Sequence, residues 1–134
     1  MDAKVIWQGE GIKFEGVSGR NVSLALGGKE DAGFSPMELV LLGLGGCTGM
    51  DCMVVMQKKR AEVHAFEIHI HAERAESHPQ KYTKIEMEYV FIGNQLDQTQ
   101  AERAVDLSAN KYCSVKASLD PAIEFVTKVT VKQS

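Results

Sequence analysis

Three short stretches of alternating apolar and polar residues lie near the start of the chain. Alternation with a period of two is typical of half-buried strands, and glycine-containing turns separate the stretches. The residues that line the predicted inner faces are Val5, Trp7, Ile12, Phe14, Gly16, Val22, Leu24 and Leu26. The pattern predicts three N-terminal strands and a closing loop within residues 1–34.

A strong helix-start signal follows this loop. Ser35 is a favoured capping residue, Pro36 suits the first helical position, and Glu38 is placed to reach back to the cap. The following residues are apolar up to a basic stretch at 58–60, where positive charge favours a helix C-terminus. We therefore expect a central helix from about residue 36 to 59, within a segment 35–60.

The apolar run inside this helix resembles a membrane span. From Leu39 to Met56 the only charged residue is Asp51, and the length is borderline for crossing about 30 Å of hydrocarbon. Four glycines weaken an isolated helix here, and the neighbouring amphipathic strands need an apolar partner. We interpret the run as a buried helix of a protein that does not span or bind a membrane.

The remaining segment, 61–134, alternates again and predicts two long strands joined by a polar turn at 77–80, as in an antiparallel hairpin. Asp97 then caps a second helix over about 98–113, and a last strand covers about 123–131. Strands in runs, not alternating with helices, indicate an α+β fold with a largely antiparallel sheet. We expect one domain, 1–134.

The amino-acid composition indicates which partners and which cellular compartment to expect. The 134 residues are 44% hydrophobic and carry a net charge of −3, so they offer no basic surplus for nucleic acid. Three cysteines cannot all pair within one chain, and no signal peptide is evident. We expect a cytoplasmic protein with reduced thiols.

The three cysteines differ in their surroundings. Cys47 lies among glycines at 43, 45, 46 and 49, which indicate close packing of the helix, access to the thiol, or both. Cys52 is rotated about 140° from Cys47 on the same helix, so the two cannot form a local pair. Cys113 ends the second helix; alone, it is typical of a small buried residue. Spacing does not show whether Cys113 reaches Cys47.

Other titratable groups offer weaker signals. His69 and His71 share a strand face and have metal-ligand spacing, but that face is the polar one. His64 falls on the apolar face, which predicts a core or interface histidine. Asp51 lies one turn after Cys47 and needs a partner, for which Arg20, Arg74 and Arg103 are candidates.

Two motifs resemble a known family. Residues 35–47, SPMELVLLGLGGC, look like the first-cysteine helix of the OsmC/Ohr family of bacterial hydroperoxide-resistance proteins. Residues 109–115, ANKYCSV, resemble its second-cysteine motif, and the order of elements matches over essentially the whole chain. The sequence is most similar to the YhfA-like branch of that family.

The resemblance implies an intertwined homodimer with antiparallel sheets around long central helices. It implies that Cys47 reduces an organic hydroperoxide and becomes a sulfenic acid, and that Cys113 then closes a disulfide. A dithiol reductant, lipoyl-type in the peroxidase branch, resets the pair. No metal or flavin cofactor is implied.

The resemblance also implies that a glutamate and an arginine serve the site. The family glutamate directly follows the helix-starting proline, whereas here Met37 takes that position and Glu38 comes one residue later. Arg20 is the only arginine in the N-terminal strands, but it lies past the usual position. If neither residue serves, the alternative is a thiol-based binding or redox-sensing protein that uses the same pocket without efficient turnover.

Overall fold

The computed structural model describes all residues from 1 to 134, and the chain forms two compact units, 1–42 and 43–134. The first unit contains the three predicted strands, β1 (Ala3–Trp7), β2 (Phe14–Ser18) and β3 (Ser23–Leu26). They form an antiparallel sheet in the order β1-β2-β3. This confirms the N-terminal strand prediction.

One face of this small sheet is apolar and exposed. The register pairs Val5 with Gly16 and Gly16 with Leu24, so these residues share a face with Trp7. Val5 is 63% exposed, Trp7 56% and Leu24 39%. This apolar sheet face is therefore an unpartnered surface of the single chain.

Helix α1 (Pro36–Lys58) begins where the capping signal predicted. The Ser35 backbone N–H donates to Glu38 Oε1 at 2.9 Å, and the Glu38 N–H donates to Ser35 Oγ at 3.2 Å, which completes a capping box. By length and composition alone α1 could cross a membrane, a criterion that core helices of soluble proteins also meet. Leu44, Cys52 and Met56 on this helix are fully buried in the core.

The second unit is built on three longer strands, β4 (Glu62–Arg74), β5 (Tyr82–Asn94) and β6 (Glu124–Gln133), in the order β4-β5-β6. β4 and β5 form the expected antiparallel hairpin. β6, however, pairs with β5 in parallel, so the expectation of antiparallel sheets is wrong for this pair. The helical segment between them carries the chain back to the start of β5, and β6 then runs in the same direction.

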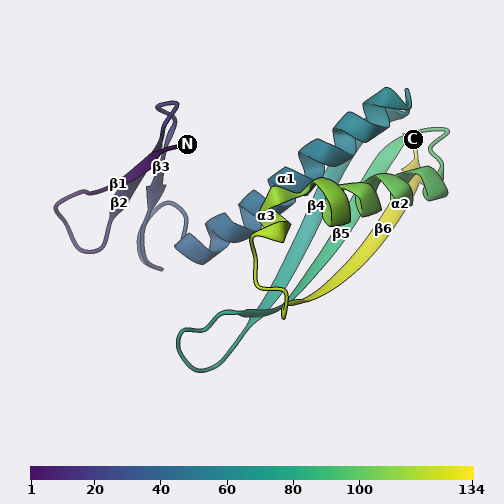
Figure 1. Cartoon of the computed structure of the whole chain (residues 1–134). Coiled ribbons are helices and arrows are strands. Elements are labelled where there is room, and N and C mark those ends of the chain that lie inside the picture. Colours follow the sequence, from purple (N-terminus) through teal and green to yellow (C-terminus); the bar gives the residue numbers. More distant parts are fainter. The chain divides into compact units, whose positions relative to one another are not determined.

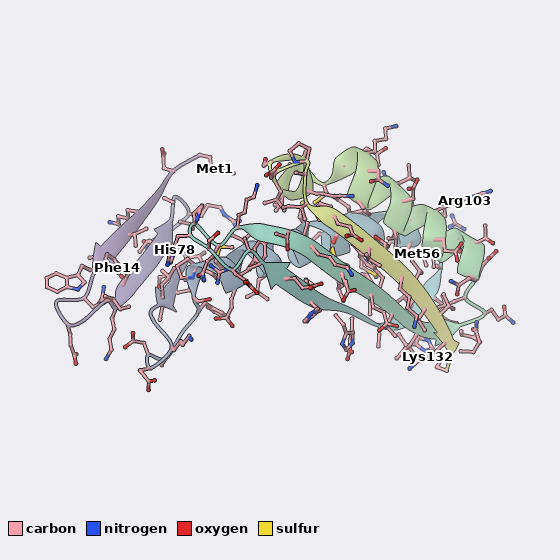
Figure 2. The ribbon with its side chains drawn as sticks, turned by 90° about the horizontal axis from the view of Figure 1, so that it is seen from below. Met1, Phe14, Met56, His78, Arg103 and Lys132 are labelled. Atoms are coloured by element: carbon pink, nitrogen blue, oxygen red, sulfur yellow. The ribbon has the colours of Figure 1, made fainter.

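Residues 43–58 of α1 and helix α2 (Gln98–Leu107) cover the same face of this sheet (Figure 1). The core between these layers is formed by inward side chains of β5 and buried residues of the two helices. They are Leu44, Thr48, Cys52, Met56, Ile85, Met87, Tyr89, Phe91, Ala101, Ala104 and Val105. Figure 2, seen from below, shows the other face of the sheet, from which many side chains project outward.

The second predicted helix is not continuous over 98–113. Asp97 caps its start, as predicted, but α2 ends at Leu107 and a π-helix, η1 (Ser108–Tyr112), follows. The Cys113 N–H donates to the Ser108 carbonyl at 2.7 Å, and Cys113 itself is extended. A short helix, α3 (Ser114–Ala117), then begins at Cys113. The break places a cysteine at a helix start, where backbone N–H groups are unpaired.

Candidate active site

The structure brings the two motif cysteines together within the second unit. Cys47 lies in the middle of α1, and Cys113 lies between η1 and α3. The Cys113 thiol hydrogen-bonds the Cys47 sulfur. Both thiols are free in this structure. Two neighbouring thiols of unequal acidity are what a reversible disulfide requires.

Cys47 receives hydrogen bonds from the start of α3. The backbone N–H of Val115 has the largest effect and, with Cys113 and Ser114, holds the pKa of the Cys47 thiol below its ordinary value. Partial burial opposes this effect. Donated hydrogen bonds stabilise the thiolate, which is the nucleophilic form of cysteine. Backbone N–H groups are thus the main stabilising partners of this sulfur, whereas the family resemblance implies an arginine.

Cys113 has the opposite character. It is only 4% exposed, and its Sγ accepts the Lys116 N–H at 3.3 Å. Burial is the main reason why its pKa lies above the ordinary thiol value, and the neighbouring Cys47 adds to the rise. Cys113 is therefore the less acidic member of the pair, and its thiol donates to Cys47.

Cys52 faces a different environment one and a half turns further along α1. It is fully buried, contacts the Ala104 carbonyl at 3.8 Å and accepts the Ser108 hydroxyl at 3.2 Å. Burial raises the pKa of Cys52 to about 11. The prediction that Cys52 is a core residue is confirmed.

The helix glycines serve two purposes. A Cβ on Gly45 would lie 2.7 Å from Ile70 Cδ1, and one on Gly49 would lie 3.0 Å from Ile68 Cδ1, so these two glycines allow α1 to approach β4. A Cβ on Gly46, next to Cys47, would meet nothing within 4 Å. The helix surface is therefore open at Gly46 itself.

Asp51 was predicted to be a paired anion, and the structure does not show such a pair. Its Oδ2 is buried without a hydrogen-bond partner, and none of the three candidate arginines pairs with it. The charge acts on Cys52, where it adds to the raised pKa, and not measurably on Cys47.

Glu38 and Arg20 belong to the first unit. The hydrogen bonds of the capping box occupy the exposed Glu38 carboxylate and hold its pKa below the usual range. Arg20 lies in the exposed turn between β2 and β3, where its backbone N–H donates to Ser18 Oγ at 3.3 Å. Their roles at the site stay predictions.

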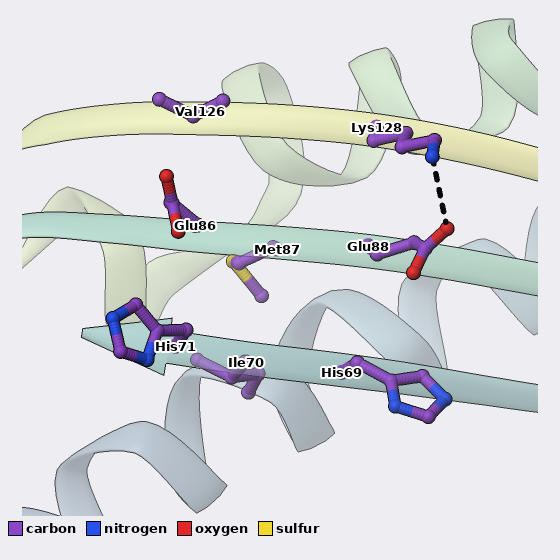
Figure 3. Close-up of a pocket in the computed structure, with 8 residues that line it drawn as sticks. All are labelled: His69, Ile70, His71, Glu86, Met87, Glu88, Val126 and Lys128. Carbon is purple, nitrogen blue, oxygen red and sulfur yellow. Dashed lines mark ion pairs between the residues drawn. The ribbon is translucent and has the colours of Figure 1, made fainter.

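His69 and His71 lie on the outer face of the second sheet. His69, His71 and their neighbours line a hollow of about 370 Å³, where Lys128 pairs with Glu88 (Figure 3). The His69 Nε2–H donates a hydrogen bond to Glu67 Oε2 at 2.9 Å. No group of three or more His, Cys, Asp or Glu side chains that could hold a metal ion lies together in the chain.

His64 is not a core residue, contrary to its place in the alternating pattern. A register shift between Val63 and Ala65 interrupts the alternation of β4. His64 is consequently exposed, and its Nδ1 lies 2.8 Å from Ser134 Oγ.

Sequence reasoning missed the contribution of Ser114 and Val115. It placed Cys113 at a helix C-terminus, where a thiolate is disfavoured, whereas Cys113 begins the next helix. Ser114 and Lys116 are polar residues in the segment that joins the second predicted helix to the last strand. Their pattern does not predict the four-residue helix α3. The structural signal is the backbone break at Cys113.

Known proteins share both sequence and fold with this chain. The family model described as OsmC-like protein matches residues 27–128. Protein YhfA of Escherichia coli K12 is 39% identical over 124 residues, which is 92% of each chain. A hypothetical protein from Aquifex aeolicus VF5 is 32% identical, with a TM-score of 0.90 and coverage of 99% and 96%.

A more distant solved structure shares only the fold with this chain. The organic hydroperoxide resistance protein OhrB of Bacillus subtilis is 21% identical over 100% of this chain and 98% of its own, with a TM-score of 0.57. The resemblance noted in the two cysteine motifs is confirmed by these matches. The chain belongs to the OsmC-like protein family.

Proposed function

We propose that this protein reduces organic hydroperoxides by a two-cysteine mechanism, with Cys47 as the peroxidatic and Cys113 as the resolving residue. The observation that carries the proposal is the Cys47 thiol with a lowered pKa, hydrogen-bonded by the buried Cys113 thiol and the Val115 N–H. The Bacillus subtilis protein of the same fold is named for organic hydroperoxide resistance, which supports the choice of an organic hydroperoxide as substrate.

The first step needs a nucleophilic sulfur. The Cys47 thiolate attacks the distal oxygen of the hydroperoxide, the O–O bond breaks, and the leaving alkoxide takes a proton from water to give an alcohol. Cys47 becomes a sulfenic acid by this two-electron oxidation. The hydrogen bonds to its sulfur favour the thiolate before attack.

The second step closes the pair. The Cys113 sulfur attacks the Cys47 sulfenic acid, an S–S bond forms, and hydroxide leaves and combines with the thiol proton as water. A dithiol reductant, which we take to be lipoyl-type, then returns both cysteines to thiols and becomes a disulfide itself. The reaction uses no metal or flavin, and free thiols suit a cytoplasmic location.

We propose further that the working form is a homodimer. The apolar sheet face defined above leaves Val5, Trp7 and Leu24 exposed in the single chain, and a second copy is a partner that carries matching apolar surface. Sedimentation of the wild type and Val5→Lys tests this: the substitution should give monomers. Lys4→Glu, on the opposite face of the same strand, is the matched control and should leave the dimer intact.

Glu38 and Arg20 are proposed to assist the site, and the structure offers a clean test for Glu38. Glutamine preserves a capping box, so Glu38→Gln should leave the melting temperature unchanged while removing the charge. Arg20→Met removes the guanidinium from an exposed turn. Unchanged peroxide reduction in both variants would remove the two residues from the mechanism.

A thiol count tests the proposed function as a whole. One equivalent of cumene hydroperoxide should consume two of the three free thiols, and peptide mapping should find one disulfide that joins Cys47 and Cys113. Cys52→Ala is the control variant, and it should lose both of its remaining thiols. Three intact thiols after treatment of the wild type would refute the proposal.

The second candidate is a thiol-based sensor or binding protein at the same site. It is favoured by the capping box, since a Glu38 carboxylate bound to Ser35 is not free to orient an arginine. A sensor would form the disulfide once and turn over slowly. Steady-state reduction with excess dithiol separates the candidates, because continuous turnover supports the enzyme.

A further inference from the structure

The two sulfurs of the pair differ in exposure. Cys113 is 4% exposed, whereas Cys47 is half-buried and so more accessible. In thiol–disulfide exchange the attacking thiolate approaches one sulfur from the side opposite to the leaving sulfur, so access matters. Attack on Cys47 comes from the side facing away from Cys113, while attack on Cys113 must pass through the packed η1–α3 region.

Thiol acidity argues in the other direction. The more acidic thiol leaves faster, and the hydrogen bonds of Cys47 make it the better leaving group. With Brønsted coefficients of about 0.4–0.5, each unit of pKa difference changes the rate by only about threefold. Exposing a buried sulfur requires local opening, which reduces the reactive population by roughly 10² or more. Access therefore outweighs acidity.

The buried sulfur also has a stabilised leaving form. The Lys116 N–H points at Cys113 Sγ from 3.3 Å, and the Cys113 N–H is held by the Ser108 carbonyl at 2.7 Å. A donor fixed on the sulfur stabilises a departing thiolate. It offsets part of the disadvantage that burial gives to this leaving group.

We propose that reduction of the 47–113 disulfide proceeds by attack of the reductant on Cys47 Sγ, with Cys113 as the leaving group. The inference rests on the proposed function, because it requires that disulfide. The reductant thiolate forms a mixed disulfide with Cys47, the S–S bond to Cys113 breaks, and the Cys113 thiolate takes up a proton. The second thiol of the dithiol then releases Cys47 as a thiolate and closes the reductant's own disulfide.

A direct consequence is that both reactants use one sulfur from one side. Hydroperoxide and reductant each approach Cys47 from the side opposite to Cys113. They consequently exclude one another, and excess dithiol should inhibit the oxidation step competitively.

A monothiol maps the attacked sulfur. The full chain carrying Cys52→Ala is oxidised in two parallel samples, one with cumene hydroperoxide and one with diamide. Each sample is treated briefly with glutathione, quenched in acid, alkylated with N-ethylmaleimide and digested for peptide mass analysis. The wild type is treated in the same way as a check on the variant.

We expect glutathione on Cys47 and maleimide on Cys113, in at least a tenfold excess over the reverse labelling. Glutathione mainly on Cys113, or equally on both, would overturn the inference and leave the proposed function standing. A disulfide formed by diamide but not by hydroperoxide would refute the proposed function, while the glutathione position would still decide the inference. Absence of the disulfide in both samples would overturn both.

Discussion

The surroundings of Cys47 and Cys52 differ although both thiols lie on helix α1. Cys52 is buried against the body of α2, where its sulfur contacts the Ala104 carbonyl and the Ser108 hydroxyl. Cys47 meets the start of α3, where the exposed backbone groups are N–H donors of Ser114 and Val115. The comparison teaches that thiol acidity here depends on how deeply a sulfur is buried and on which hydrogen-bond donors it meets, and not on the helix that carries it.

The largest expected effect comes from removing each of these thiols in turn. Cys47→Ser should lower cumene hydroperoxide consumption by about 10³-fold or more, since the attacking atom is lost. Cys52→Ala should retain most of the activity, because its sulfur is fully buried and ionises only near pH 11. Peroxide loss measured with excess dithiol checks both variants. Equal losses would mean that Cys52 belongs to the reaction.

At alkaline pH the burial of Cys52 should lower the free energy of unfolding. In the unfolded chain the thiol ionises with the ordinary cysteine pKa of 9.0, whereas in the folded chain its pKa is about 11. The unfolded state is therefore favoured progressively as the pH rises between these values, by roughly 1.4 kcal/mol for each unit of pKa difference.

Urea unfolding at pH 7.5 and 10.5 measures this effect. The wild type should lose stability relative to Cys52→Ala by roughly 2 kcal/mol between the two pH values. Tyr89, whose pKa burial raises to about 12, contributes a loss of the same sign in both proteins, and only the part of its shift that comes from Cys52 remains in the difference. A constant difference between the two proteins would contradict the buried-thiol account.

The hydrogen bond from Cys113 offers a smaller test of Cys47 acidity. Cys113→Ala removes this donor, so the pKa of Cys47 should rise and its alkylation at pH 7 should slow by roughly tenfold. Cys113→Ser keeps a donor at the same place and should react nearly as fast as the wild type. Iodoacetamide kinetics against pH compare the two variants.

The same serine variant separates activation from resolution. Cys113→Ser cannot close the disulfide, and a sulfenic acid should persist on Cys47 after one equivalent of peroxide. Dimedone labelling and mass analysis detect it. Equal alkylation rates in the alanine and serine variants would show that the Cys113 donor is unimportant and that the backbone N–H groups suffice.

Much of this architecture could be predicted from residue patterns. The capping box at Ser35, the cap at Asp97 and the long hairpin depend on local propensity and alternation, and the structure contains all three. The parallel pairing of β6 depends on where the intervening helices return the chain, which spacing does not encode. The bulge that exposes His64 inserts a single residue into an otherwise regular alternation.

The two cysteines of the candidate site could be predicted from the sequence. The hydrogen bonds that lower the pKa of Cys47 could not. Family motifs identify Cys47 and Cys113, whereas the N–H donors come from a four-residue helix that begins where the sequence predicts a helix end. Backbone donors carry no residue signature, since any non-proline residue supplies one. The family resemblance therefore pointed to Arg20 and Glu38, and no residue pattern pointed to the Val115 N–H.

The smallest expected effect tests whether the two thiol environments are independent. The Ser108 hydroxyl donates to the Ala104 carbonyl at 2.9 Å and lies 3.2 Å from Cys52 Sγ, so Ser108→Ala should cost about 1 kcal/mol or less of unfolding free energy. The higher helix propensity of alanine offsets part of this loss. Ser108 supports Cys113 only through its backbone carbonyl, which alanine keeps at the same place. Cys47 alkylation should consequently be unchanged while the pKa of Cys52 rises further, and slower alkylation of Cys47 would instead reveal one shared network beneath both thiols.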